Sequence, residues 1–473
     1  MTRARVGLLV GLALFAAALT LPAPAGMPEP AWRAAAVAML MAAWWVTEAI
    51  PIPATALLPL LLFPLLGILP IGDAASPYAN PVIYLFMGGF LIAAALEQCG
   101  LHRRMALVII RAGGTQPARL IGAFMVATAF LSMWVSNTAT VAMMLPLALS
   151  IIGVVRAGAP DGARDPHFAV AMLLGLAYAS SIGGIGTLIG TPPNALLAGF
   201  MSETYGVTIG FRQWMLLGVP LVVVSLPIAW LALTKLVYPV SGEEIAGGRS
   251  VVRAQMRELG AASREEWTVG VITAITAAAW VFRPQLAVLV PGISDTGIAI
   301  GGALLLFLVP ASRDGRPALD WAAAERLPWG VLVLFGGGLS LAAAIQDTGL
   351  AGWIGASLSF VGGWPLLPVI LVVTTVVVFL TELTSNTATA AAFLPVVGAL
   401  AGAIFVDPML LAVPTAIAAS CAFMMPVATP PNAIVYGSGE IAIGDMLRAG
   451  LILNVIMVVI VTAASVVLVP ALF

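Results

Sequence analysis

Long apolar runs separated by short polar gaps dominate the pattern along the 473 residues of the chain. A membrane-spanning helix needs about 20 consecutive apolar residues. Reading the runs by length predicts spans over 6–22, 33–50, 54–71, 82–100, 168–200, 213–238, 266–283, 296–311, 329–350, 409–437 and 447–472. Two further runs, 119–156 and 366–405, are too long for one straight helix. The pattern predicts an all-α polytopic membrane protein with about 11 transmembrane helices and two additional segments.

The composition supports this fold class and excludes several others. Hydrophobic residues make up 61% of the chain and charged residues 9%, whereas an ordinary soluble domain carries about 25% charged residues. The formal net charge is −1, so nothing favours nucleic acid as a partner. Two cysteines and two histidines leave little material for a metal centre or a nucleophile–base pair. We therefore expect no enzyme activity.

The N-terminal apolar run, 6–21, follows Arg3 and Arg5. It can be a cleaved signal peptide or the first transmembrane helix, and we favour the helix because polytopic proteins rarely need a cleaved signal. Both interpretations cross the bilayer once, so the orientation of the later spans does not depend on the choice.

The distribution of basic residues indicates how the two overlong segments cross the membrane. If each is a hairpin that returns to its starting side, and the N-terminus is cytoplasmic, 17 of the 20 basic residues fall inside and 3 outside. If each crosses once, the count is 9 inside against 11 outside. The positive-inside rule favours hairpins in the cell (inner) membrane. Pairs of complete spans would give the same count, but a polar tip buried by protein favours re-entrant hairpins.

The chain also contains an internal repeat. The stretch 85–101 (LFMGGFLIAAALEQCGL) matches 334–350 (LFGGGLSLAAAIQDTGL) at nine of 17 positions. At the same offset of 249, SNTATVAMMLP from Ser136 matches SNTATAAAFLP from Ser385. A Thr-Pro-Pro-Asn-Ala motif then occurs at Thr191 and again at Thr429. The two copies have opposite orientations in the predicted topology, and such an inverted-topology repeat is typical of alternating-access transporters.

Four polar breaks are the candidate chemistry of the chain. Each hairpin carries a Ser-Asn-Thr tip, and each Thr-Pro-Pro-Asn motif interrupts an apolar helix because consecutive prolines disrupt helical hydrogen bonding. The breaks leave free carbonyls on one side and free N–H groups on the other. Hydroxyl, amide and carbonyl oxygens suit a hard monovalent cation, and helix N-termini attract anions. Polar residues that only join helices are the alternative, but matched positions in both copies favour a binding site.

Charge suggests how ions and substrate are linked. No lysine or arginine lies near the four breaks in the sequence. A divalent anion in a low-dielectric site needs neutralisation, and co-bound cations at two symmetric sites would supply it. Two acidic residues lie near these motifs. The role of Glu382 stays open, because its carboxylate could tune a cation site or form a structural hydrogen bond to a neighbouring helix. Glu48 is expected to face the interfacial region.

At these motifs the sequence resembles the divalent anion:sodium symporters. The paired triplets, the paired Thr-Pro-Pro-Asn segments, WVTEAIP at 45–51 and ASCAFMMPVATPPNAIV at 419–435 carry the resemblance over nearly the whole chain. The resemblance implies a homodimer that imports C4-dicarboxylates together with sodium. It also implies an elevator motion of a transport domain against a scaffold domain.

The resemblance further implies the site residues. Sodium ligands are expected at two sets of positions, namely Ser132, Ser136, Asn137 and the Gly190 carbonyl, and Thr381, Thr384, Asn386 and the Ala428 carbonyl. Substrate-binding residues are expected at Asn137, Thr138, Thr191, Pro192, Ser385, Asn386, Thr387, Thr429 and Pro430. A sulfate or citrate symporter, or a sodium-independent dicarboxylate exchanger, remains an alternative with the same fold.

The resemblance and the spans together divide the chain into four parts. Residues 1–118 are expected to form scaffold helices, and 119–212 the first half of the transport domain. Residues 213–365 return to the scaffold and include a solvated, charged cytoplasmic connector at 239–266. Residues 366–473 form the second half of the transport domain.

Overall fold

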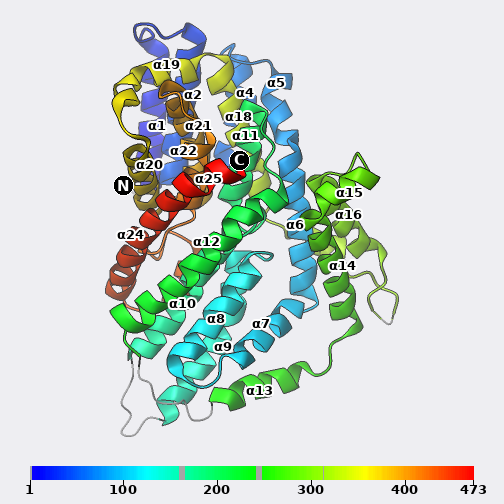
Figure 1. Ribbon diagram of the computed structural model, residues 1–473. Helices are drawn as coiled ribbons and strands as arrows, with labels where there is room; N and C mark the ends of the chain where they lie inside the picture. The colour runs from blue at the N-terminus through cyan, green and yellow to red at the C-terminus, as the bar shows by residue number, and fades with distance from the viewer. Residues whose placement is uncertain (1–2, 159–165, 241–247, 313) are drawn as a thin grey trace.

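The computed structural model describes residues 3–158, 166–240, 248–312 and 314–473. Within these residues the chain forms helices and no β-strand (Figure 1). Eight described helices are long and apolar enough to span a membrane, or nine if the bent pair Arg264–Val281 and Arg283–Leu289 counts as one span. The predicted all-α, multi-pass architecture is confirmed.

The N-terminal helices lie along one side of the molecule. α1 (Arg3–Thr20) and α2 (Glu29–Thr47) pack against each other. The single helix expected over 54–71 is wrong, because this proline-containing stretch divides into α3 (Ile52–Thr55) and α4 (Leu58–Leu65). α5 (Ile71–Ala75), the 3₁₀ turn η1 (Ser76–Ala79) and α6 (Pro81–Gln98) follow.

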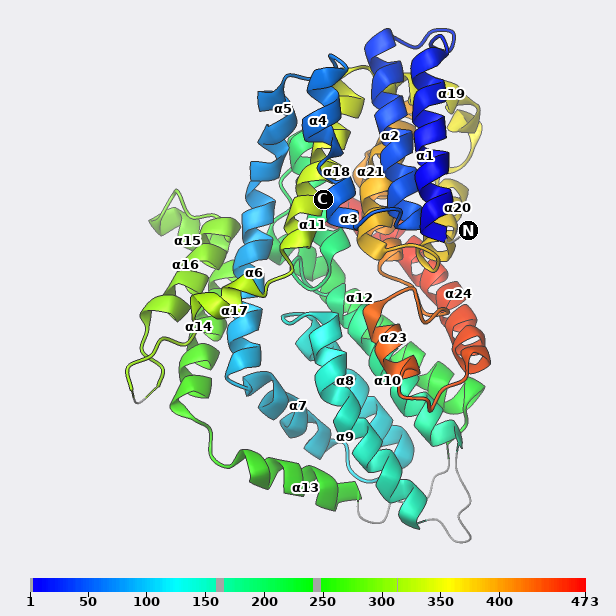
Figure 2. The same ribbon diagram turned by 180° about the vertical axis from the view of Figure 1, so that it is seen from behind.

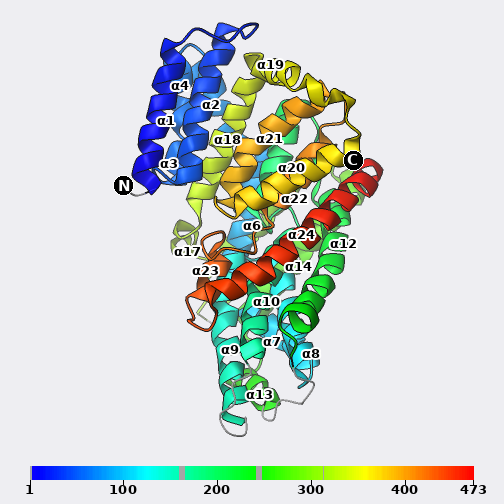
Figure 3. The ribbon, with the colours of Figure 1, turned by 90° about the vertical axis from the view of Figure 1, so that its left-hand side faces the viewer.

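Both overlong segments form helical hairpins. The first consists of α8 (Pro117–Ser132) and α9 (Asn137–Gly158), and the second of α20 (Leu366–Thr381) and α21 (Asn386–Ala403). Each Ser-Asn-Thr triplet lies at the turn between the two helices. Figures 2 and 3 show α8 and α9 in the lower part of the molecule and α20 and α21 in the upper part. The hairpins thus approach the centre from opposite ends, as the inverted repeat requires.

Both Thr-Pro-Pro-Asn motifs interrupt helices. The first break separates α10 (Pro166–Gly184) from α11 (Pro192–Tyr205), and the second separates α22 (Met409–Ala419) from α23 (Pro430–Tyr436). Of the 18 residues His167–Gly184 of α10, 94% are buried, and α8, α9, α12 and α23 pack around this helix. The offset between the copies falls from 249 at the Ser-Asn-Thr triplets to 238 at the Thr-Pro-Pro-Asn motifs, so the first copy is 11 residues longer between them. The loop 156–166, where we expect these extra residues, lies mostly outside the described residues.

The remaining described helices complete the two halves. They are α7 (Leu101–Ala112), α12 (Phe211–Leu231) with the π-helical turn η3 (Ala232–Val237), α13 (Gly248–Leu259), α14 (Arg264–Val281), α15 (Arg283–Leu289), α16 (Asp295–Leu308), α17 (Trp321–Glu325), α18 (Trp329–Asp347), α19 (Leu350–Ser357) with the 3₁₀ turn η4 (Ser359–Gly363), α24 (Ile443–Val467) and α25 (Val469–Leu472).

The connector expected at 239–266 is not only a solvated loop, because it contains the helix α13. Val252 of α13 is buried while Arg253 and Arg257 are exposed, so the helix is amphipathic and packs on α7 and α9. Arg104 of α7 fixes the connector by binding Glu266 at 2.7 and 3.0 Å and donating to the Gly260 carbonyl at 3.0 Å. This ion pair joins α7 to the start of α14, directly after the connector helix α13, which lies across the lower end of the molecule (Figure 1).

Candidate functional site

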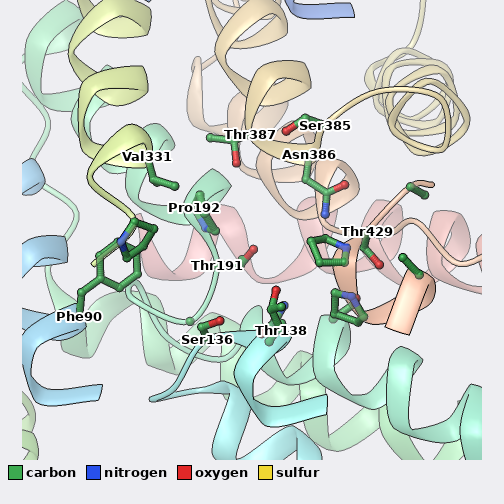
Figure 4. Close-up of a pocket in the computed structure, with 18 of the residues that line it drawn as sticks. Phe90, Ser136, Thr138, Thr191, Pro192, Val331, Ser385, Asn386, Thr387 and Thr429 are labelled. Carbon is green, nitrogen blue, oxygen red and sulfur yellow. The ribbon is translucent and has the colours of Figure 1, made fainter. Parts of the chain in front are cut away.

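The four polar breaks meet around one cavity of about 650 Å³, here called the site cavity. Figure 4 shows Ser385, Asn386 and Thr387 above it and Ser136 and Thr138 below it. The residues expected to bind substrate all line it, namely Asn137, Thr138, Thr191, Pro192, Ser385, Asn386, Thr387, Thr429 and Pro430. The fold therefore brings together positions that lie almost 300 residues apart in the sequence.

The first hairpin tip forms a compact group of oxygen atoms. A Cβ atom placed on Gly184 would lie 3.1 Å from both amide atoms of Asn137 and 3.0 Å from the carbonyl oxygen of Gly190. Ser132 Oγ and Asn137 Oδ1 are buried and have no hydrogen-bond partner within the described residues. Such oxygens are costly to bury alone, and their chemistry fits a hard cation such as sodium.

The second hairpin tip has the same layout with more internal hydrogen bonds. Thr381 Oγ1 lies 2.8 Å from Asn386 Oδ1 and 2.9 Å from the Ala419 carbonyl oxygen. Thr384 Oγ1 lies 2.5 Å from Thr389 Oγ1 and 3.1 Å from the Leu380 carbonyl oxygen. Thr381 is thus hydrogen-bonded to the tip residue Asn386. The hydroxyl of Thr384 instead contacts two other residues of the hairpin, Leu380 and Thr389.

The expected sodium ligands fall into two layers. Those that line the site cavity are Ser136, Asn137, Gly190, Asn386 and Ala428. Ser132, Thr381 and Thr384 are buried in the hairpins and do not line it. Each tip therefore places some polar groups at the cavity surface and others behind it.

The asparagine of each Thr-Pro-Pro-Asn motif binds backbone carbonyls of its helix break in the same way. Asn194 donates its side-chain N–H to the carbonyls of Gly184 at 3.1 Å and Thr187 at 2.8 Å. Asn432 donates to Ala422 at 3.1 Å and Met425 at 3.0 Å, which are the repeat-related carbonyls at an offset of 238. Both asparagines are fully buried. The sequence identified these breaks but not this bracing role.

Thr429 ends the second break by capping α23. Its hydroxyl accepts the backbone N–H of Asn432 at 3.2 Å, as a residue at the start of a helix commonly does. Thr191, at the start of α11, instead lies 3.5 Å from Ser420 Oγ of the other repeat. The two broken helices are thus in contact beside the site cavity.

Glu382 supports the second break through hydrogen bonds. Its carboxylate is 3% exposed and accepts the backbone N–H groups of Phe423 at 2.6 Å, Met424 at 2.9 Å and Met425 at 3.0 Å. Asn454 of α24 donates a fourth hydrogen bond at 2.8 Å. Of the two roles left open by the sequence, these contacts establish the structural one. The repeat-related position in the first hairpin is Met133, so only the second break has a carboxylate.

Glu48 is exposed and also lines the site cavity. The helix α2 ends there, and Glu48 takes a left-handed conformation with φ of 50°. Its position relative to the interfacial region stays a prediction. Residues in such sparsely populated conformations often mark functional sites. Among the described residues that line the site cavity, none is lysine or arginine. A bound anion would therefore meet hydroxyls, amides and helix termini rather than a fixed positive charge.

Paired helical hairpins and paired broken helices around a central cavity are the architecture of many secondary membrane transporters. The family model for the sodium:sulfate symporter transmembrane region matches residues 3–473. The chain therefore belongs to this symporter family, which confirms the resemblance found in the sequence. It is a transporter and not an enzyme.

Several curated relatives are similar over nearly their whole length. A sodium-dependent dicarboxylate transporter, SdcS, of Staphylococcus saprophyticus is 42% identical over 473 residues, which is 98% of this chain and 91% of the relative. The protein of the same name from Staphylococcus aureus strain USA300 is 41% identical over 464 residues, covering 96% and 89%.

Solved structures with low sequence identity share the fold. The YdaH transporter of Alcanivorax borkumensis has a TM-score of 0.58 at 16% identity, covering 93% of this chain and 98% of that one. Neisseria gonorrhoeae MtrF, from a class of antimetabolite efflux pumps, has a TM-score of 0.60 at 13% identity, covering 99% and 95%. At these identities the likeness concerns the fold alone.

Proposed function

We propose that the chain is a sodium-coupled symporter that imports C4-dicarboxylates such as succinate, malate and fumarate. The observation that carries this proposal is the pair of Ser-Asn-Thr tips facing each other across one cavity. Two similar polar ends separated by a short gap match a molecule with a carboxylate at each end. The names of the relatives, which are sodium-dependent dicarboxylate transporters, point the same way.

Electrostatics supports the coupling to sodium. The site cavity has no basic lining residue within the described chain, and transferring a dianion into such a site unpaired is costly. Sodium ions at the two hairpin tips would offset the charge. The unpartnered oxygens of Ser132 and Asn137 support a cation at the first tip, and the paired oxygens of Thr381 and Asn386 support one at the second.

The helices form two groups that we propose to move against each other in an elevator mechanism. The transport group comprises α8–α12 and α20–α24, and the scaffold group comprises α1–α6 and α14–α18. α12 belongs with the transport group because it packs on α8, α10 and α24, which moves the proposed boundary from 212 to the end of η3. We also propose a homodimer, with the N-terminus of each subunit in the cytoplasm of a cell with an inner membrane.

Transport of radiolabelled substrate tests this function. Purified protein in liposomes is expected to take up succinate when an inward sodium gradient is imposed, and to lose uptake when choline replaces sodium. Malate and fumarate should compete, whereas the monocarboxylate butyrate should compete poorly because it lacks the second charged end.

The same experiment decides between the alternatives. Sulfate or citrate competing more strongly than succinate would assign the chain to a different anion. Full succinate exchange in choline would identify a sodium-independent exchanger. Either result would overturn the proposal.

A further inference from the structure

A second cavity joins the site cavity on one side. It has a volume of about 570 Å³ and is here called the vestibule. Five residues line both cavities, namely Phe90, Ala93, Ser136, Thr138 and Pro328. The two spaces are therefore continuous past the first hairpin tip. Glu97, Gln98 and Arg326 line the vestibule but not the site cavity, and all three are exposed, so the vestibule opens to the surface beside charged and polar side chains.

The vestibule contains the one basic residue among the described residues that line the two cavities. That residue is Arg326, and the acidic lining residues are Glu48 and Glu97. Arg33, Arg103, Arg104, Arg156 and Arg283 each form an ion pair. The side chain of Arg326 forms no ion pair or hydrogen bond with the described residues. Its guanidinium thus keeps all of its donors for a solute.

The backbone that carries Arg326 is firmly held in the scaffold group. Asp320 caps the short helix α17 by accepting the N–H of Ala323 at 2.8 Å. The indole of Trp329 donates to the Ala324 carbonyl at 3.2 Å, and Leu327, directly after Arg326, is buried. Buried and capped residues on both sides therefore fix the point from which the arginine side chain extends.

We propose that Arg326 guides the divalent anion between the cytoplasm and the site cavity. This inference rests on the proposed function and on the predicted topology, in which Arg326 is one of the 17 basic residues on the cytoplasmic side. A fixed positive charge at the mouth of a low-dielectric cavity raises the local concentration of an anion and its rate of entry. Since Arg326 lies outside the site cavity, the guanidinium attracts the dianion without competing with sodium inside.

The attraction by Arg326 should act from the cytoplasmic side alone, and it should depend on the charge of the substrate. An attraction at the cytoplasmic mouth alters the KM measured from that side, while the opposite face meets the site by another route. Its strength falls at high ionic strength because the Debye length shrinks from about 10 Å at 0.1 M to about 3 Å at 1 M salt. A monoanionic substrate analogue such as succinamate should feel a smaller change than succinate.

Sided transport assays with Arg326→Gln test the proposal. Inside-out and right-side-out vesicles give the cytoplasmic and external KM of succinate at fixed sodium, with ionic strength varied by choline chloride. We expect Arg326→Gln to raise the cytoplasmic KM about tenfold at low ionic strength, with little change at high salt and none in the external KM. Arg326→Lys should restore the wild-type value because it keeps the charge.

Arg316→Gln is the matched control, since Arg316 is exposed nearby and does not line the vestibule. An unchanged cytoplasmic KM in Arg326→Gln, an equal change on both faces, or a change that salt does not reduce would overturn this role. If the wild-type protein shows no sodium-driven succinate transport, the proposed function fails first. The two failures are therefore distinguishable.

Discussion

At the scale of single residues, the two asparagines at the hairpin tips carry the strongest expectation. Asn137→Ala and Asn386→Ala each remove an amide oxygen that we propose as a sodium ligand. We expect each variant to weaken apparent sodium affinity by about tenfold or more, which corresponds to about 1.4 kcal/mol of binding free energy. Succinate uptake measured against sodium concentration gives this number.

Controls for these variants come from the same hairpins. Ser150→Ala and Thr375→Ala remove exposed hydroxyls that bind carbonyls of their own helices, Pro146 and Leu371. They should leave the sodium dependence unchanged. Normal sodium affinity in both asparagine variants would show that these residues are not ligands.

Glu382 leads to a different expectation because four hydrogen-bond donors converge on its buried carboxylate. Glu382→Gln replaces one acceptor oxygen by an N–H group that faces a backbone donor. We expect a loss of stability of about 1–3 kcal/mol, visible as a lower melting temperature in detergent, together with weaker stabilisation by sodium. Met133→Leu, at the repeat-related position, should change the sodium effect little. An unaltered melting curve for Glu382→Gln would contradict the bracing role.

The residues that line the site could largely be identified from the sequence, but their support could not. Ser-Asn-Thr and Thr-Pro-Pro-Asn are polar or helix-breaking motifs in apolar surroundings, so they are visible without a structure. The acceptors of Asn194 and Asn432 are backbone carbonyls, which leave no trace in the side-chain pattern. The place of Glu48 at the cavity could not be predicted for a related reason: it depends on how α2 ends and packs, not on local composition.

At the scale of helices, the inverted orientation of the two hairpins can be tested by labelling. In a background without Cys99 and Cys421, cysteines are placed at Gln116, before α8, and at Phe405, after α21, both of which are exposed. We expect a membrane-impermeant maleimide to label Phe405→Cys from outside and Gln116→Cys only after permeabilisation. Labelling of both from the same side would be incompatible with the inverted repeat.

The contact between Arg104 and the connector is a second property of the helices. Arg104→Ala leaves the Glu266 carboxylate, with 6% of its side chain exposed, without its cationic partner. We expect α13 to detach more often from α7, so that trypsin cuts after Arg253 or Arg257 several times faster. Arg111→Ala, on an exposed position of the same helix, is the control. Equal cleavage rates in the two variants would contradict the anchoring role of Arg104.

The helices differ in how well the hydropathy pattern predicts them. Long apolar runs such as that of α18 were predicted closely because span length is set by the bilayer. The pattern failed at α3 and α4, where prolines divide one apolar run, and at α13, where polar composition concealed an amphipathic period. In both stretches the decisive information is the spacing of a few residues rather than the mean hydropathy.

At the scale of the whole molecule, an elevator motion requires contacts between the two helix groups to break during each cycle. One such contact is the stack of Phe211 on Trp280, with ring centroids 4.2 Å apart. Phe211 begins α12 of the transport group, and Trp280 lies in α14 of the scaffold group. A contact within the scaffold, between Phe86 of α6 and Phe335 of α18 at 5.1 Å, should persist throughout the cycle.

Reversible cross-linking separates these two kinds of contact. In the cysteine-free background, oxidising the pair Phe211→Cys and Trp280→Cys is expected to abolish sodium-driven uptake, because the transport group can no longer leave the scaffold. Reductant should restore it, which distinguishes a blocked motion from a packing defect. Oxidising Phe86→Cys and Phe335→Cys should leave uptake close to its reduced value, since both residues move together. Full uptake with the first pair cross-linked would mean that α12 does not move against α14, and a rigid scaffold with local gating at the hairpin tips would then replace the elevator.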